Sequence, residues 1–207
     1  MLNLIKKDYI FTRKQLCVAV LYCIVAPILL VIDGGTKLYW AQFFIPFCSV
    51  SFILGKIFYM EDATDVRYFL KRLPYTVYER VGARFCFMGI TLFLSEVYLI
   101  FVQYFLFHQA FRVILRSNAI PIFIFIMYYS LYIMLAYCFG YLLAQNSIYV
   151  CMVIAAIMTI AYERMNISIN FSEMANIETI TILLILSIGI IFLLYIIACK
   201  GDLKREN

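Results

Sequence analysis

The sequence predicts an all-α polytopic membrane protein with six transmembrane helices in a single transmembrane domain, residues 1–207. Of its 207 residues 66% are hydrophobic and only 14% are charged, and the mean hydropathy is +0.96. Soluble globular domains have about half apolar and about a quarter charged residues, so this composition excludes a soluble domain. A helix needs about 20 apolar residues to cross a bilayer. The predicted spans are residues 16–32, 38–60, 82–107, 119–143, 148–162 and 178–199.

The first segment, residues 1–15, is too charged to cross a membrane. Leu2, Ile5 and Tyr9 fall on one side of a helix, and most of the Lys and Arg residues fall on the other. This pattern predicts an interfacial helix that lies in an anionic membrane leaflet. No small-residue cleavage site follows it, so the first span is expected to be retained.

The charged segment between the second and third spans, residues 61–80, is expected to lie in water and to begin with a short helix. Asp62 can cap this helix, and Asp65 favours the same positive helix end. Pro74 ends the helix, because proline disfavours the helical conformation in the residue before it. One apolar stripe follows the helical period. The stripe consists of Val66, Phe69, Leu70 and Leu73, and the cations that lie off it are Arg67, Lys71 and Arg72.

A second helix is predicted to start directly after the proline. Thr76 and Glu79 have the spacing of a T-x-x-E capping box, which marks a helix N-terminus. A short amphipathic helix, a proline break and a capped restart suit a part that docks on a cytosolic partner. The alternative is an interfacial helix that lies on lipid headgroups.

The distribution of Lys and Arg predicts the orientation of the chain. If the N-terminus is inside, 13 of the 17 Lys and Arg residues lie on the inner side. The four on the other side are Lys37, Arg112, Arg116 and Arg164. This excess predicts that both termini and residues 61–80 are cytosolic. Residues 163–177 are then expected to form an extracellular loop or to re-enter the membrane.

Motifs for catalysis and nucleotide binding do not occur in the sequence. It has no G-x-x-x-x-G-K-[ST], H-E-x-x-H or G-x-S-x-G. We therefore expect no enzyme activity, no catalytic residue and no cofactor in this chain. The seven cysteines lie in or beside apolar segments without a C-x-x-C pair, which predicts buried hydrophobes and no metal site. The net charge of +5 does not indicate nucleic-acid binding, because the basic residues flank the spans.

Glu96 is an acidic residue deep in the third predicted span. At about 1.5 Å per residue from Arg84 it lies roughly 18 Å into the membrane, near its middle. A lone carboxylate there is costly, and it indicates either a polar translocation path or a hydrogen-bonded contact between helices. Gln103 lies seven residues further on, on the same face of the helix.

Together, these features resemble the small bacterial permease subunits of ABC-2-type transporters. The topology match covers the whole chain, including a short fifth span with a polar segment after it, which is similar to the re-entrant extracellular element of that family. The motif-level match covers about 25 residues around the linker. It consists of an acidic residue at Glu61 or Asp62, Leu73-Pro74, the capping box from Thr76 to Glu79, and Arg84 leading into the third span.

The resemblance implies a permease subunit of an exporter in the bacterial plasma membrane. The linker would be the coupling helix that docks on a dimer of separate cytosolic ATPase subunits, which would hold ATP-Mg. A second permease subunit, identical or a sister chain, would complete the translocation path. The residues implied for ATPase coupling are Asp62, Asp65, Arg67, Phe69, Leu70, Lys71, Arg72, Leu73 and Pro74, and the candidates for the translocation path are Glu96 and Gln103.

The cargo and two alternative functions rest on less specific features. The aromatic and apolar spans favour a peptide or a hydrophobic drug as cargo. One alternative is a substrate-binding membrane subunit of an energy-coupling-factor importer, but such subunits carry an A-x-x-x-A pattern in the first span, and here Ala19 is followed by Cys23. The other alternative is a stand-alone membrane binding or immunity protein.

Overall fold

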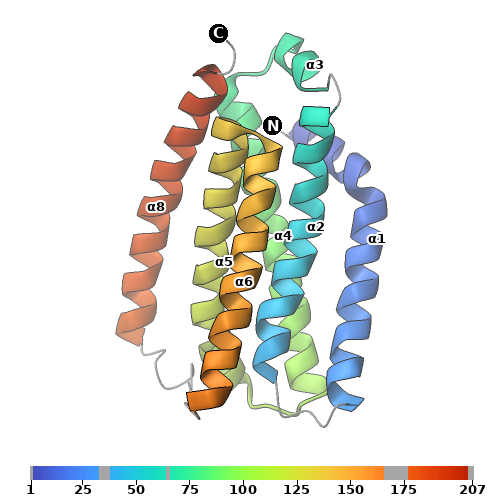
Figure 1. The fold of residues 1–207 in the computed structure, drawn as a ribbon, viewed down its shortest axis with the longest axis vertical. Coiled ribbons are helices and arrows are strands. Elements are labelled where there is room, and N and C mark those ends of the chain that lie inside the picture. The colour runs from blue at the N-terminus through green and yellow to red at the C-terminus, as the bar shows by residue number, and fades with distance from the viewer. Residues whose placement is uncertain (1, 33–37, 64–65, 166–176, 205–207) are drawn as a thin grey trace.

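The computed structural model describes residues 2–32, 38–63, 66–165 and 177–204, and within these ranges every regular element is a helix (Figure 1). The predicted all-α fold is therefore confirmed. The helices are α1 (Leu2–Ile32), α2 (Leu38–Ala63), α3 (Val66–Arg72), α4 (Val77–Phe105), α5 (Phe111–Phe139), α6 (Tyr141–Met165) and α8 (Ile177–Lys204).

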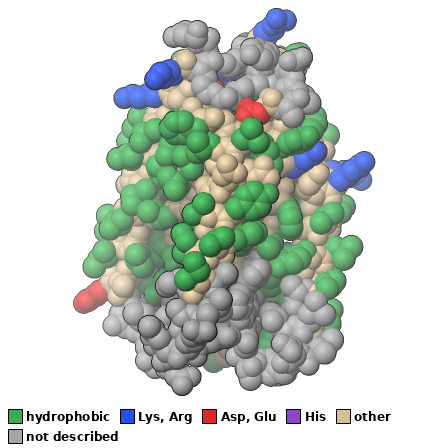
Figure 2. Space-filling model, viewed as in Figure 1, with side chains coloured by type: hydrophobic (Ala, Val, Ile, Leu, Met, Phe, Trp, Pro, Cys, Tyr) green, Lys and Arg blue, Asp and Glu red, His purple; other side chains and the backbone are tan. Residues whose placement is uncertain are grey.

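Three of the described helices are long and apolar enough to cross a membrane. They are α4, α5 and the part of α8 from Glu178 to Lys204, and α6 contributes a shorter apolar stretch, Tyr141–Ile154. Figure 2 shows hydrophobic side chains along the sides of the bundle. The structure thus describes a membrane protein, and the count of six spans stays a prediction.

The long helices run side by side, and α3 crosses one end of the bundle, where both termini also lie (Figure 1). Helix α4 packs against α1, α2, α5 and α8, while α5 also packs against α6 and α8. The main hydrophobic core lies between α2, α4 and α5. Its almost fully buried members include Val50, Leu54, Val81, Tyr129, Tyr132 and Ile133.

The start of α1 and the linker differ in detail from the sequence-based prediction. Residues 2–15 and the first predicted span form one continuous helix, α1. Asp62 belongs to the last turn of α2, so its predicted role as the cap of α3 is wrong. Helix α3 ends at Arg72, just before Leu73-Pro74, as predicted. The capping box is confirmed: the Glu79 amide donates to Thr76 Oγ1, and the Thr76 amide donates to the Glu79 carboxylate.

The small and polar residues 144–147, between the fourth and fifth predicted spans, predict a turn, but this prediction is wrong, because the chain reverses at Gly140 between α5 and α6. Gly140 has a φ of 99°, a conformation that side-chain-bearing residues rarely adopt. The polar residues at the predicted turn fit within α6: Ser147 Oγ donates to the Ala144 carbonyl, and Gln145 Nε2 donates to the Tyr149 hydroxyl. Helix α5 also begins at Phe111, earlier than the predicted residue 119.

Candidate functional site

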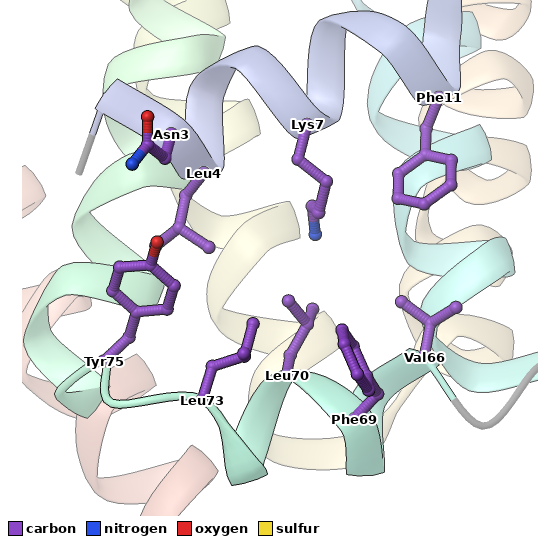
Figure 3. Close-up of a pocket in the computed structure, with 9 residues that line it drawn as sticks. All are labelled: Asn3, Leu4, Lys7, Phe11, Val66, Phe69, Leu70, Leu73 and Tyr75. Atoms are coloured by element: carbon purple, nitrogen blue, oxygen red, sulfur yellow. The ribbon is translucent and has the colours of Figure 1, made fainter.

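The apolar stripe of α3 faces the N-terminal part of α1 across a groove of about 520 Å³. In Figure 3 the Lys7 side chain enters this groove from α1, and Phe69 and Leu70 enter it from α3. The groove is lined by Asn3, Leu4, Lys7, Phe11, Val66, Phe69, Leu70, Leu73 and Tyr75. We call it the α1–α3 groove.

The members of the stripe divide into buried and exposed residues. Leu70 is only 6% exposed and packs with Leu4 and Ala83 of the same chain. Leu70 is therefore covered by its own chain, and its implied role in ATPase coupling stays a prediction. Phe69 is 62% exposed, and Leu73 is half-buried. Phe69 thus remains available to a partner.

The polar members of the predicted coupling set are described only in part. Arg72 and Pro74 are exposed. Asp65 lies outside the described residues, as do the side chains of Arg67 and Lys71. Their roles in coupling stay predictions.

Beneath α3, buried charges join three helices at the same end of the bundle. Arg84 of α4 pairs with Asp8 of α1 and with Glu61 of α2. Lys7 Nζ lies 3.2 Å from Asp8 Oδ1 and 3.3 Å from Glu61 Oε1. We call these four residues the charge cluster. It holds two cations and two anions, so its formal charge is balanced.

The balance matters because these groups have little access to water. Asp8 and Arg84 are 0% and 3% exposed, and an isolated charge at such a site is very costly. Burial, together with the nearby Arg84 cation, lowers the pKa of Lys7 from 10.5 to about 8, although Glu61 opposes this shift. Lys7 thus carries a proton that it releases more easily than a solvated lysine.

A second ion pair ties α8 to α4 next to the cluster. Arg80 Nη2 lies 3.0 Å from Asp202 Oδ2, and both side chains are largely buried. Close by, the Tyr195 hydroxyl donates to the Tyr78 carbonyl over 3.0 Å. The C-terminal helix is therefore fixed to the start of α4 by polar contacts as well as by packing.

Asp62 makes a contact that the sequence did not predict. Its Oδ2 atom accepts a hydrogen bond of 2.6 Å from the Tyr141 amide, at the first residue of α6. A carboxylate at a helix N-terminus satisfies an amide that lacks an intrahelical partner. Asp62 thus connects the end of α2 to α6.

The two predicted path residues lie on α4 in different surroundings. Glu96 is 5% exposed, and its carboxylate oxygens have no hydrogen-bond partner in the described part of the chain. Gln103 forms a reciprocal amide pair with Asn118 of α5, with two hydrogen bonds of 3.1 Å. Glu96 is therefore a polar group without a partner here, whereas Gln103 fastens α4 to α5.

Comparison with known proteins decides how these features are interpreted. A family model described as ABC-2 family transporter protein matches residues 3–201. The chain belongs to the ABC-2 transporter family. No curated protein and no solved structure matches the chain. It is therefore an ABC-2-type permease of the membrane, and the resemblance inferred from the linker is confirmed.

In this ABC-2 permease, the linker motif and the charge cluster share residues. Glu61 and Arg84, at the two ends of the motif, are ion-pair partners. Asp8 and Asp202 were missed from the sequence. Their only signal is an acidic residue within a basic segment, and the partners that explain them lie far away in the chain.

Within the ranges that the structure describes, no group of three or more His, Cys, Asp or Glu side chains is placed to hold a metal ion. The candidate site of the permease consists of the α1–α3 groove, the charge cluster and the Asp62 contact, all at the end of the bundle that carries α3.

Proposed function

We propose that this permease is the membrane subunit of an ATP-driven exporter and that α3 is its contact with a separate cytosolic ATPase. The observation that carries the proposal is the exposed Phe69 beside the apolar α1–α3 groove. Helix α3 crosses the end of the bundle instead of lying within it (Figure 1). Large aromatic side chains that enter a partner's pocket supply much of the energy of protein interfaces.

The position of charge supports a cytosolic location for this end. Figure 2 shows several Lys and Arg side chains near the end that carries α3, as the positive-inside rule expects of the cytosolic side. In this proposal the chain has six spans in the bacterial plasma membrane, with both termini in the cytosol. It does no catalysis itself, and ATP-Mg binds to the ATPase dimer.

The translocation path is proposed to form with a second permease subunit, either a copy of this chain or a sister chain. Glu96 supports a polar path, because a buried carboxylate without a partner among the described residues is expensive in a membrane. Gln103 is the weaker candidate, because Asn118 already satisfies its amide. The aromatic and apolar spans favour a peptide or a hydrophobic drug as cargo, moved outward.

The docking role is tested by purifying the tagged permease from its native membranes in mild detergent. We would measure the associated protein and the ATP hydrolysis of the eluate. The double variant Phe69→Asp/Leu73→Asp is expected to lose the ATPase, because two carboxylates in an apolar contact would be buried without partners. The matched control is Tyr78→Asp, which changes another exposed aromatic residue at the same end of the bundle and is expected to retain the ATPase.

Two results would contradict the proposal. One is an unchanged amount of ATPase with the Phe69→Asp/Leu73→Asp variant, which would place the docking surface elsewhere. The other is a wild-type permease that purifies alone and without ATP hydrolysis, which would favour a stand-alone membrane binding protein. Equal thermal stability of the two variants would show that the loss of ATPase is not a loss of folding.

A further inference from the structure

Two neighbouring carboxylates in the last turn of α2 hold different helices. Glu61 pairs with Arg84 of α4 and with Lys7 of α1. Asp62 accepts from the Tyr141 amide at the start of α6. Helix α3 begins at Val66, only four residues after Asp62. The last turn of α2, which precedes α3 in the chain, is therefore bound on one side to α1 and α4, and on the other side to α6.

The Asp62 contact lies beside the one-residue connection between α5 and α6. Gly140 alone separates α5 from α6, and its φ of 99° is one that glycine adopts without strain. Outward-facing side chains of α6, such as Leu142 and Val153, are exposed in the chain. Among the described helices α6 packs mainly against α5 and α2, so a change of angle about Gly140 would alter chiefly these two contacts.

We propose that Asp62 is a positioning residue that transmits movement of α3 to α6. The inference rests on the proposed function, because an ATPase must move α3. A displacement of α3 shifts the last turn of α2, and Asp62 passes this shift to the N-terminus of α6 through its hydrogen bond. Glu61 pairs the same turn with Lys7 of α1 and Arg84 of α4. A displacement of this turn therefore acts on neighbouring helices and is not taken up by bending of α2 alone.

Hydrogen–deuterium exchange of the permease with its co-purified ATPase tests the proposal. Exchange is compared between the nucleotide-free complex and the complex trapped with ATP and vanadate. In the wild type, trapping is expected to change exchange in α3 and in the first turn of α6. In Asp62→Ala the change in α3 is retained and the change in α6 is lost. Loss of the cap also speeds exchange in the first turn of α6 roughly fivefold without nucleotide.

A second pair of variants tests the same hydrogen bond from the donor side. Tyr141→Pro removes the amide proton at a helical position that tolerates proline, whereas Tyr141→Ala removes the ring and keeps the proton. The proline variant is expected to lose the response of α6, and the alanine variant is expected to keep it. Thr76→Ala serves as the structural control, because it weakens the start of α4 and leaves the contact of Asp62 with α6 intact.

The outcomes separate the inference from the proposed function. A response of α6 that survives both Asp62→Ala and Tyr141→Pro overturns the role of Asp62 and leaves docking at α3 intact. A wild-type complex in which trapping changes α6 but not α3 overturns docking at α3, and the relay with it. A loss of the α6 response in Thr76→Ala would also overturn the assignment to Asp62, because general weakening of this end would then suffice.

Discussion

Arg84 of α4 pairs with Asp8 of α1, and both side chains are almost completely buried beneath α3. The partners are 76 residues apart in the chain (84 − 8), so the contact forms only when the N-terminal part of α1 lies across the end of the bundle. Removing one partner of a buried pair leaves the other charge without compensation. The pair therefore ties the position of α1 to that of α4 next to the proposed docking helix.

Replacement of Arg84 is expected to destabilise the permease strongly. Arg84→Met leaves the Asp8 and Glu61 carboxylates with Lys7 as the remaining cation of the cluster, at a cost of about 3–5 kcal/mol. Thermal unfolding in detergent measures the effect. Arg116→Met is the matched control, because Arg116 is exposed, and its effect is expected within about 0.5 kcal/mol. Equal stability of the two variants would show that the cluster contributes nothing to folding.

Lys7 gives the permease a dependence of stability on pH. Its pKa is about 8 in the folded protein and 10.5 for a free lysine, so between these values the unfolded chain binds more protons. Stability from this group therefore rises from pH 8 to pH 10.5, by at most roughly 1.4 kcal/mol per pH unit. Lys7→Met is expected to remove this rise when both proteins are unfolded by denaturant at several pH values. Parallel curves for the two proteins would contradict the prediction.

Local features of the linker could be predicted from sequence because their causes are local. The capping box of Thr76 and Glu79 depends on residues three apart, and the end of α3 depends on Pro74. The turn between α5 and α6 was misplaced because four small and polar residues, 144–147, gave a stronger turn signal than Gly140 alone. The side chains of Gln145 and Ser147 bond within α6, which is compatible with a helical backbone there.

The charge cluster and the Asp62 contact could not be predicted in this way. Sequence spacing suggested that Asp62 caps the nearby α3, but the structure gives it a partner 79 residues away, on α6. The same kind of spacing predicts that Lys7 lies on the polar side of an interfacial helix, whereas it pairs with Glu61 of α2. Such pairs depend on how helices pack, which the period of a single helix does not determine.

The two central residues of the α3 stripe are expected to respond differently to truncation. Leu70→Ala creates a cavity between α3, α1 and α4, and it should lower the free energy of unfolding by about 2–5 kcal/mol. Phe69→Ala should change stability by less than about 1 kcal/mol, because the ring is 62% exposed. Chemical unfolding of both variants in detergent measures the difference. A larger loss for Phe69→Ala would mean that its ring is covered by this chain.

The reciprocal pair of Gln103 and Asn118 should behave as a coupled unit. Gln103→Leu leaves the buried Asn118 amide without its partner, which costs about 1–3 kcal/mol. The double variant Gln103→Leu/Asn118→Leu is expected to lose less than the sum of the two single variants, because neither amide is then left unsatisfied. A double-mutant cycle of unfolding free energies measures this coupling. Strict additivity would show that the pair does not hold α4 and α5 together.

Gly201 is expected to be required for the close approach of α8 to α5. A Cβ atom at Gly201 would lie 2.5 Å from Cys138 Sγ and 3.0 Å from Cys138 Cα, whereas a Cβ at Gly189 meets nothing within 4 Å. Both glycines lie in α8, so they share the same gain in helix propensity on replacement by alanine. Gly201→Ala should therefore lose about 1–3 kcal/mol through overpacking, and Gly189→Ala should lose nothing.

Adding Cys138→Ala to Gly201→Ala separates the two parts of this clash. The double variant removes the sulfur, but the contact with the Cys138 backbone remains, so it is expected to recover only part of the lost stability. Thermal unfolding of the wild type, Gly201→Ala, Gly189→Ala and the double variant Gly201→Ala/Cys138→Ala measures these differences. Full recovery would assign the clash to the sulfur alone, and equal stability of Gly201→Ala and Gly189→Ala would contradict the close contact between α5 and α8.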